Sequence, residues 1–114
     1  MRRGEVWLIN LNPTIGAEIK KTRPAVIVND DAIGILPLKV IIPNTEWKDR
    51  YAIAPWMVRL EPDESNQLDK VSAADAFQVR SVSQQRFVRQ VGILSRDVMS
   101  EINSALSIVL GLSK

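Results

Sequence analysis

Residues 24–28, Pro-Ala-Val-Ile-Val, are the stretch that decides the fold. An unbroken apolar run that is rich in β-branched residues is typical of a central strand buried on both faces. Three similar runs lie at residues 6–9, 38–42 and 56–60, and Asn or Pro follows each of them within two residues. Short strands joined by short connections favour an antiparallel, partly closed sheet.

The spacing of apolar residues changes in the second half of the chain. Residues 76–82 and 87–94 each predict a strand, the first with one wet face, and residues 83–86 predict a turn or short helix. After Ser95, a suitable N-cap, apolar residues recur every three or four positions until Gly111, which predicts an amphipathic helix of about fifteen residues. The expected fold class is mainly β, with about six strands and a C-terminal helix.

The composition limits both the core and the chemistry. A chain of 114 residues is too short for two independently stable cores, so residues 1–114 are expected to form one domain. The chain has no cysteine and no histidine. Thiolate chemistry, Cys-based metal sites and a histidine base near pH 7 are therefore excluded. Any catalysis has to use Arg, Lys, carboxylate or hydroxyl groups.

Charge is unevenly distributed, although the formal net charge is only +2. Residues 1–23 carry five basic and two acidic side chains, and residues 76–96 carry four arginines and no acid. Residues 46–75 carry four basic and seven acidic side chains. If the fold joins the two basic segments, they form a positive face that attracts phosphates, with the acidic segment pointing elsewhere. The alternative is that all three segments are ordinary solvated surface.

Several functional classes lack the sequence features that they need. Asn10 breaks the first apolar run, no stretch approaches the ~20 apolar residues of a membrane span, and neither GxGxxG nor GxxxxGK[ST] occurs. The acidic residues within the polar loop expected at residues 61–69 have spacings that suit solvent rather than a metal ion. We therefore expect a soluble protein of a reducing compartment, with no membrane contact and no metal or cofactor.

The loop before the central strand contains the candidate for anion binding. Residues 12–23 include a glycine and end in Lys-Lys-Thr-Arg, directly before Pro24. At the mouth of the core the guanidinium of Arg23 is expected to be partly desolvated, which suits a phosphate ligand. The alternative is a structural ion pair between Arg23 and Glu18.

Four stretches, taken together in their order and spacing, resemble the MazF/PemK family of toxin endoribonucleases. They are Arg-Gly-Glu-Val-Trp at residues 3–7, Asn-Pro-Thr-Ile-Gly-Ala-Glu at 12–18, Arg-Pro-Ala-Val-Ile-Val at 23–28 and Ile-Pro-Asn-Thr at 42–45. The segment 72–81 and the predicted helix match the family's remaining landmarks. The resemblance thus covers nearly the whole chain.

The resemblance implies an SH3-like barrel of the MazF/CcdB type, assembled as a homodimer. It implies the toxin of a type II toxin–antitoxin system: a metal-independent mRNA interferase that cuts single-stranded RNA at a short motif, without a cofactor. The RNA's own 2′-hydroxyl is the nucleophile, which leaves a 2′,3′-cyclic phosphate and a 5′-hydroxyl. The implied partners are mRNA and a MazE-like antitoxin with an acidic C-terminal segment. DNA is contacted only through the antitoxin, and the setting is the cytoplasm of a bacterium or archaeon.

Three catalytic residues follow from the resemblance. Arg23 matches the family's essential arginine and is expected to stabilise the phosphorane. Thr45 matches the essential threonine and is expected to hydrogen-bond a phosphate oxygen, the alternative being a hydroxyl that caps a turn. Glu18 matches the loop glutamate and is the candidate base, or the group that orients Arg23.

One departure leaves the base open. Some relatives carry a catalytic aspartate just before their Gln-x-[RK] element, where this chain has Phe77. Asp75, two residues earlier, and Arg23 itself therefore remain alternatives to Glu18 as the base.

RNA-binding residues are expected around the catalytic ones. Basic side chains suit phosphates, and aromatic or amide side chains suit unstacked bases. The loop after Thr45, where aromatic and basic residues alternate, is expected to set the sequence preference. Phe77 has a core or interface position as its alternative. The full set is Lys20, Lys21, Asn44, Trp47, Lys48, Phe77, Gln78 and Arg80.

Two other functions are compatible with such a barrel. A gyrase poison resembling CcdB depends on a terminal Trp-Gly-Ile, whereas this chain ends Gly-Leu-Ser-Lys. A non-catalytic SH3-like binding module has no need to retain Arg23, Thr45 and Glu18. The endoribonuclease is therefore the favoured interpretation.

Overall fold

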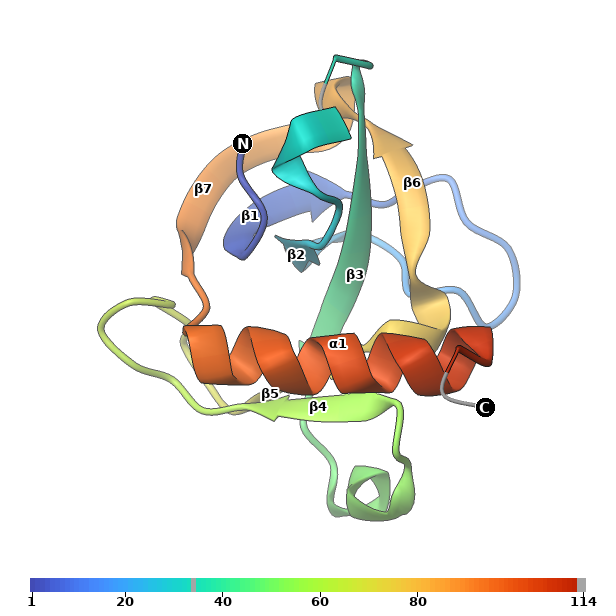
Figure 1. The fold of residues 1–114 in the computed structure, drawn as a ribbon, viewed down its shortest axis with the longest axis vertical. Coiled ribbons are helices and arrows are strands. Elements are labelled where there is room, and N and C mark those ends of the chain that lie inside the picture. The colour runs from blue at the N-terminus through green and yellow to red at the C-terminus, as the bar shows by residue number, and fades with distance from the viewer. Residues whose placement is uncertain (34, 113–114) are drawn as a thin grey trace.

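The computed structural model describes residues 1–33 and 35–112, which fold into a curved sheet and one long helix (Figure 1). Within these residues seven strands form an antiparallel sheet in the order β4-β5-β3-β2-β1-β7, with β6 paired to β3 outside this path, and the sheet is not closed. The elements are β1 (Glu5–Asn10), β2 (Thr22–Ile27), η1 (Asp31–Ile33), β3 (Leu38–Glu46), η2 (Asp49–Ile53), β4 (Met57–Leu60), β5 (Ser72–Asp75), η3 (Ala76–Gln78), β6 (Arg80–Ser83), η4 (Gln84–Arg86), β7 (Phe87–Ile93) and α1 (Arg96–Leu110), where η marks a 3-10 helix.

The C-terminal helix α1 is confirmed at both of its ends. The hydroxyl of Ser95 accepts the N–H of Val98 at 3.2 Å, as an N-cap does, and Asp97 lies in the first turn. Gly111 follows the last turn at φ +70°, the left-handed conformation that favours glycine. Among the described residues, none of the helices has the length and apolar character needed to cross a membrane.

Strand β3 organises the sheet because it has three partners along its length. It pairs with β6 at its beginning, with β2 over residues 41–43 and with β5 over residues 44–46. The change from β2 to β5 falls directly after Pro43, which has no N–H to donate to a ladder. Figure 1 shows β3 as the long strand at the centre of the molecule.

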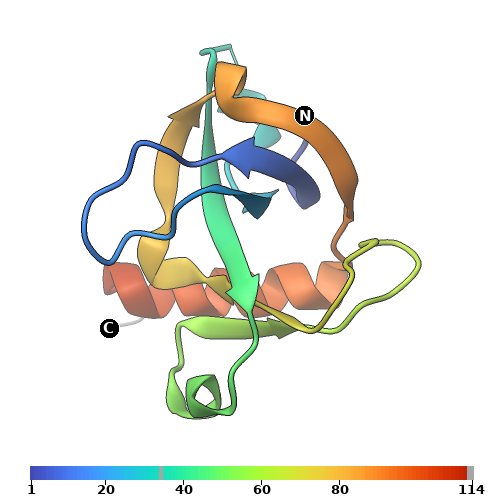
Figure 2. The same cartoon turned by 180° about the vertical axis from the view of Figure 1, so that it is seen from behind.

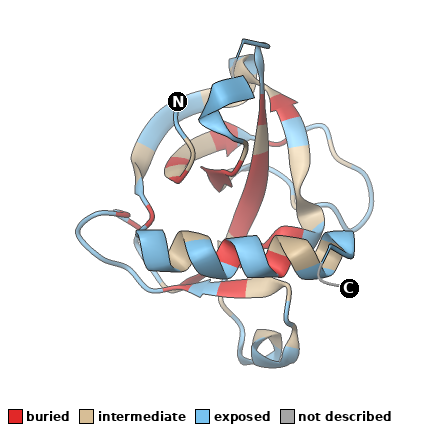
Figure 3. Ribbon diagram, viewed as in Figure 1, coloured by how far each residue is buried: buried red, intermediate tan, exposed pale blue. Residues whose placement is uncertain are grey.

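Two apolar clusters lie on the two faces of the central strands, because successive side chains of a strand point to opposite faces. Val26 and Ile42 pack with Ile102 of α1 in the first cluster. Ile27 and Ile41 belong to the second. These strand residues are fully buried, which confirms that residues 24–28 contain a strand covered on both faces (Figure 3).

Two segments differ from the sequence prediction. Strand β5, between β3 and β4, was not predicted, so that there are seven strands rather than about six. The strand predicted at residues 76–82 begins only at Arg80, because residues 76–78 form the 3-10 helix η3. A carboxylate oxygen of Asp75 accepts the N–H of Phe77 at 3.1 Å and thereby caps this short helix.

The two basic segments of the sequence are joined in the fold. Strand β1 pairs with β7 from Glu5 to Ile9, which brings residues 1–23 beside residues 76–96. The condition on which the charge prediction depends, that the fold joins the two basic segments, is therefore met.

Candidate active site

Arg23 and Thr45 lie just beyond the last residues that β2 and β3 pair. That last pair is Ala25 with Pro43, and Thr45 itself pairs with Ala73 of β5. Arg23 and Thr45 are both partly buried, and both line a cavity of about 320 Å³, called cavity B. Its other lining residues are Leu8, Pro24, Asn44, Glu46, Leu68, Asp69, Lys70, Ser72 and Arg89.

The guanidinium of Arg23 is held by the chain that precedes it. Its Nε donates to the carbonyl oxygen of Lys20 at 2.9 Å. Within the described residues no carboxylate lies within ion-pair distance of Arg23, so the alternative of an ion pair with Glu18 is wrong. Its two Nη atoms make no hydrogen bond to the described protein and are available to an anionic ligand.

Glu18 lines a different cavity from Arg23 and Thr45. This cavity A, of about 460 Å³, is lined by Ala17, Glu18, Ile19, Pro43, Phe77, Gln78, Val79 and Arg80. One Glu18 oxygen, Oε1, accepts the N–H of Ile15 at 2.6 Å, and no hydrogen bond engages Oε2. Pro43 lines cavity A, whereas Thr45, two residues later on β3, lines cavity B with Arg23. The two cavities share no lining residue.

The loop of residues 11–21, which joins β1 to β2, is fastened by side chains from the last third of the chain. Gln78 accepts the N–H of Ile19 at 2.6 Å and donates to the carbonyl of Ala17 at 3.1 Å. Arg80 donates to the carbonyl of Leu11 at 3.3 Å. Arg86 donates to the carbonyls of Asn10 and Asn12. Figure 2 shows this blue loop reaching across beside β6.

The predicted RNA-binding residues divide into four places, the last of which contains Trp47 and Lys48. Lys20 and Lys21 lie exposed on the loop of residues 11–21, and Asn44 lines cavity B. Phe77, Gln78 and Arg80 line cavity A. The ring of Phe77 is 66% exposed and meets Trp56 edge to face, with ring centroids 5.9 Å apart, so that its alternative as a core residue is wrong.

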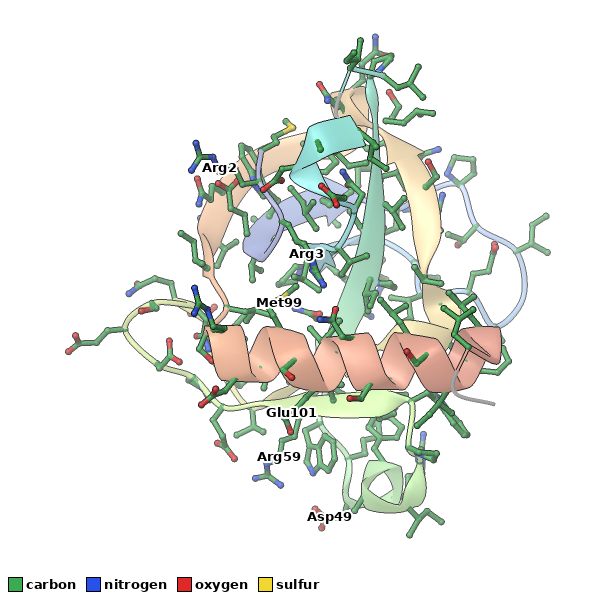
Figure 4. The ribbon with its side chains drawn as sticks, in the orientation of Figure 1. Arg2, Arg3, Asp49, Arg59, Met99 and Glu101 are labelled. Atoms are coloured by element: carbon green, nitrogen blue, oxygen red, sulfur yellow. The ribbon has the colours of Figure 1, made fainter. Side chains whose placement is uncertain are left out.

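Trp47 and Lys48 line neither cavity A nor cavity B. The Trp47 ring packs edge-on to Tyr51, and the guanidinium of Arg59 lies 5.1 Å from its centroid. This group borders a separate cavity beside α1, which Glu101 also lines (Figure 4). The aromatic part of the loop expected to set sequence preference thus lines a different cavity from Arg23 and Thr45, although the loop starts directly after Thr45.

Asp75, an alternative for the base, also lines neither cavity A nor cavity B. Its side chain is buried, and burial raises its pKa above the usual value, although the hydrogen bond from the N–H of Phe77 acts in the opposite direction. The Asp75 carboxylate caps η3, and its role in the fold is therefore structural.

The acidic segment does not point entirely away from the basic face, which corrects the charge prediction. Glu46 and Asp69 line cavity B together with Arg23, and Glu46 pairs with Lys70 at 3.5 Å. Sequence reasoning missed Asp69 because the loop of residues 61–71 has no periodicity to indicate which side chains face the sheet. It also missed Arg89, although the excess of arginine in residues 76–96 indicated the right segment.

The donor set does not favour a bound metal ion. In the described ranges 1–33 and 35–112, no three carboxylates gather into a group that could hold one. Cavity B offers instead a guanidinium with two open Nη donors and a threonine hydroxyl, groups that suit a phosphodiester, with the carboxylates of Glu46 and Asp69 in the same lining.

The fold and this site define a small, mainly β protein with an arginine and a threonine together at one cavity. The chain belongs to the family of PemK-like, MazF-like toxins of type II toxin–antitoxin systems, whose model matches residues 2–110. It is 34% identical over 112 residues to endoribonuclease MazF of Staphylococcus saprophyticus, covering 98% of this chain and 92% of the relative. It is 30% identical over 118 residues to endoribonuclease MazF9 of Mycobacterium tuberculosis, covering 98% of both. A MazE–MazF structure from Deinococcus radiodurans superposes with a TM-score of 0.74 at 25% identity, covering 98% of this chain and 96% of that one.

Proposed function

We propose that this chain is the endoribonuclease toxin of a type II toxin–antitoxin pair and that residues 1–114 act as a single toxin domain. It cleaves single-stranded mRNA in the cytoplasm at a short sequence motif and thereby inhibits translation and growth. The observation that carries the proposal is the shared cavity of Arg23 and Thr45, where two Nη donors are open to a phosphate. Family membership and two relatives named endoribonuclease support it.

In the proposed reaction the 2′-hydroxyl oxygen of the RNA attacks the neighbouring phosphorus. A P–O2′ bond forms and the P–O5′ bond breaks, which yields a 2′,3′-cyclic phosphate and a 5′-hydroxyl. The attacking hydroxyl loses its proton to a base, and the leaving 5′-oxygen receives one. The Nη atoms of Arg23 and the hydroxyl of Thr45 stabilise the charge on the phosphorane oxygens.

Glu18 is the base that the site favours among the three alternatives. Its Oε2 is open, and Lys20, whose carbonyl holds Arg23, follows it by two residues in the same loop. Asp75 is buried and occupied as the η3 cap. Arg23 is suited neither to be the base nor to be the proton donor, because a guanidinium keeps its protons. It stabilises charge, and the leaving 5′-oxygen takes its proton from water.

The proposed assembly is a homodimer that an antitoxin inhibits. The relative from Deinococcus radiodurans was solved as a MazE–MazF complex. Exposed apolar side chains such as Ile35 (97%) and Leu36 (62%) are available for contacts between chains. A MazE-like acidic segment would complement the cations around cavities A and B and exclude RNA. Sedimentation at micromolar concentration is expected to give twice the mass of the chain, and a stable monomer would contradict the dimer.

The test of the enzymatic proposal uses long RNA in the presence of EDTA. The purified chain is expected to produce discrete fragments that end in 2′,3′-cyclic phosphate. Arg23→Ala and Thr45→Val are each expected to reduce the rate by roughly 10²–10³, the usual effect of losing one charge-stabilising donor. Arg96→Ala removes an exposed arginine at the start of α1 and is the matched control. Intact RNA with the wild-type chain, or equal rates for wild type and Arg23→Ala, would refute the proposal.

A further inference from the structure

The side chain of Asn44 is buried without a hydrogen-bond partner. The residue is 2% exposed, and neither its Nδ2 nor its Oδ1 finds a partner among the described residues. Buried polar groups are nearly always paired, because leaving one unpaired costs its full desolvation. Asn44 lines cavity B, so a ligand in that cavity is the partner that would satisfy both atoms.

Asn44 ends a row of side chains that crosses four strands. Arg89 of β7 pairs with Leu8 of β1, and Leu8 pairs with Pro24 of β2. The β2–β3 register, continued by one residue, places Asn44 opposite Pro24. The row therefore has a cation at one end, a primary amide at the other and an apolar floor between them, over about 14 Å of strand spacing.

Residues 66–70 form a roof over this row. Leu68, Asp69 and Lys70 line cavity B from the side opposite the strands. The roof is anchored to β7 because the N–H of Ile93 donates to the carbonyl of Ser65 at 2.9 Å. An adjoining cavity of about 290 Å³ shares Leu8, Pro24, Leu68, Asp69 and Arg89 with cavity B, so that the two form one slot between sheet and roof.

We propose that this slot binds the adenine nucleotide next to the cleaved phosphate, with the amide of Asn44 on the adenine edge and the guanidinium of Arg89 on that nucleotide's own phosphate. The donor and acceptor of an asparagine amide match the N7 acceptor and N6 donor of adenine. Leu8 and Pro24 supply apolar contact to the face of the base. The proposal rests on the proposed function, because Arg23 and Thr45 line the same cavity and place the cleaved phosphate beside the slot.

Binding requires the roof to shift. The amide atoms of Asn44 are shielded from solvent, so the base reaches them only after a local opening of cavity B. The exposed ion pair of Lys70 with Glu46 holds the Lys70 end of the roof weakly. The Asn66 end, in contrast, is held by the hydrogen bond that its amide donates to the carbonyl of Glu61 at 2.8 Å. The opening is therefore expected at the Lys70 end. We expect hydrogen exchange in residues 66–70 to slow when a nucleotide occupies the slot.

The first test measures binding of the four nucleoside 5′-monophosphates by calorimetry, without any cleavage. AMP is expected to bind about tenfold more tightly than GMP, CMP or UMP, the effect of one good bidentate base contact. Asn44→Leu is nearly isosteric and is expected to abolish this difference while its melting temperature stays equal or rises, because an unpaired buried amide is removed. Arg89→Gln is expected to weaken all four nucleotides equally, and the control Arg96→Gln none.

The second test uses short RNA oligonucleotides that carry the mapped cleavage motif. Replacing adenine beside the cleaved phosphate by purine, which lacks the N6 amino group, is expected to reduce kcat/KM about tenfold in the wild type and not at all in Asn44→Leu. The inference is overturned if the wild type binds the four monophosphates equally, or if Asn44→Leu keeps the preference for AMP. If AMP binds as expected but no RNA is cleaved, the proposed function fails and the nucleotide slot stands.

Discussion

The backbone of Ser65 lies directly over Gly92 of β7. A Cβ atom built on Gly92 would be 2.4 Å from the carbonyl oxygen of Ser65 and 2.5 Å from that of Asn66. Real Cβ atoms do not approach backbone so closely, and backbone cannot yield as the end of a flexible side chain can. Glycine is therefore required at position 92 because a side chain does not fit there. Its backbone conformation is not the reason, since its φ is not in the left-handed region.

Gly92→Ala is expected to destabilise the chain by about 1–3 kcal/mol, the usual cost of overpacking. The direction of this change in stability is informative. In a strand interior, replacing glycine by alanine ordinarily stabilises a protein, by roughly 0.5–1 kcal/mol. Urea denaturation measures the effect. Val88→Ala, at an exposed position of the same strand, is the control and should change stability by no more than about 0.5 kcal/mol. A Gly92→Ala variant as stable as this control would contradict the close approach.

Arg23→Lys is expected to lower the cleavage rate nearly as far as Arg23→Ala, by roughly 10² or more. Lysine keeps the charge but has neither the Nε that donates to Lys20 nor a planar pair of donors for a phosphate. Initial rates on a fluorogenic RNA measure the loss, and an unchanged melting temperature shows that folding is intact. A lysine variant with near wild-type rate would mean that charge alone suffices at this position.

Gln78→Ala is expected to lower kcat about tenfold or more while KM changes little. The amide of Gln78 binds the backbone on both sides of Glu18, at Ala17 and Ile19, so its loss lets the proposed base drift from its place. Proteolysis within residues 11–21 should become faster in parallel. Gln85→Ala, an exposed glutamine of η4, is the matched control. A selective rise in KM would instead indicate that Gln78 contacts RNA directly.

Asp75→Asn is expected to become more stable relative to the wild type as pH rises from about 4 to 7. Burial raises the pKa of the Asp75 carboxyl in the folded chain above its usual 3.8, against the opposing hydrogen bond from Phe77. The folded state then holds this proton more tightly than the unfolded state, so stability falls as pH rises through the folded pKa. Asparagine can still accept the N–H of Phe77. Melting curves of both chains across this range should converge at the acid end, and a constant difference would contradict the shift.

Much of the fold could be predicted because its signals are local. The N-cap at Ser95, the three- and four-residue spacing and Gly111 fix α1 from contacts within the helix. Strand β5 could not be predicted in this way. Its sequence, Ser-Ala-Ala-Asp, lacks β-branched residues, and all four residues are buried because small side chains fit between β3 and β4.

The candidate site was predictable where the family's motifs mark its residues and unpredictable where it depends on loops. Arg23 and Thr45 follow from the resemblance, and the fold brings both to cavity B. The position of Asp69 depends on the path that residues 61–71 take past β7. That path is fixed by backbone contacts such as the one between Ile93 and Ser65, which leave no pattern in the side chains.

The hydrogen bonds that hold the loop of residues 11–21 affect which parts of its sequence can change during evolution. Gln78, Arg80 and Arg86 grip only main-chain atoms of the loop and its margins, at Ala17, Ile19, Leu11, Asn10 and Asn12. Main-chain atoms are the same for nearly every amino acid. The side chains that the loop presents to a substrate can therefore be exchanged without loosening its anchorage, so that one scaffold can acquire new RNA preferences through substitutions confined to a single loop.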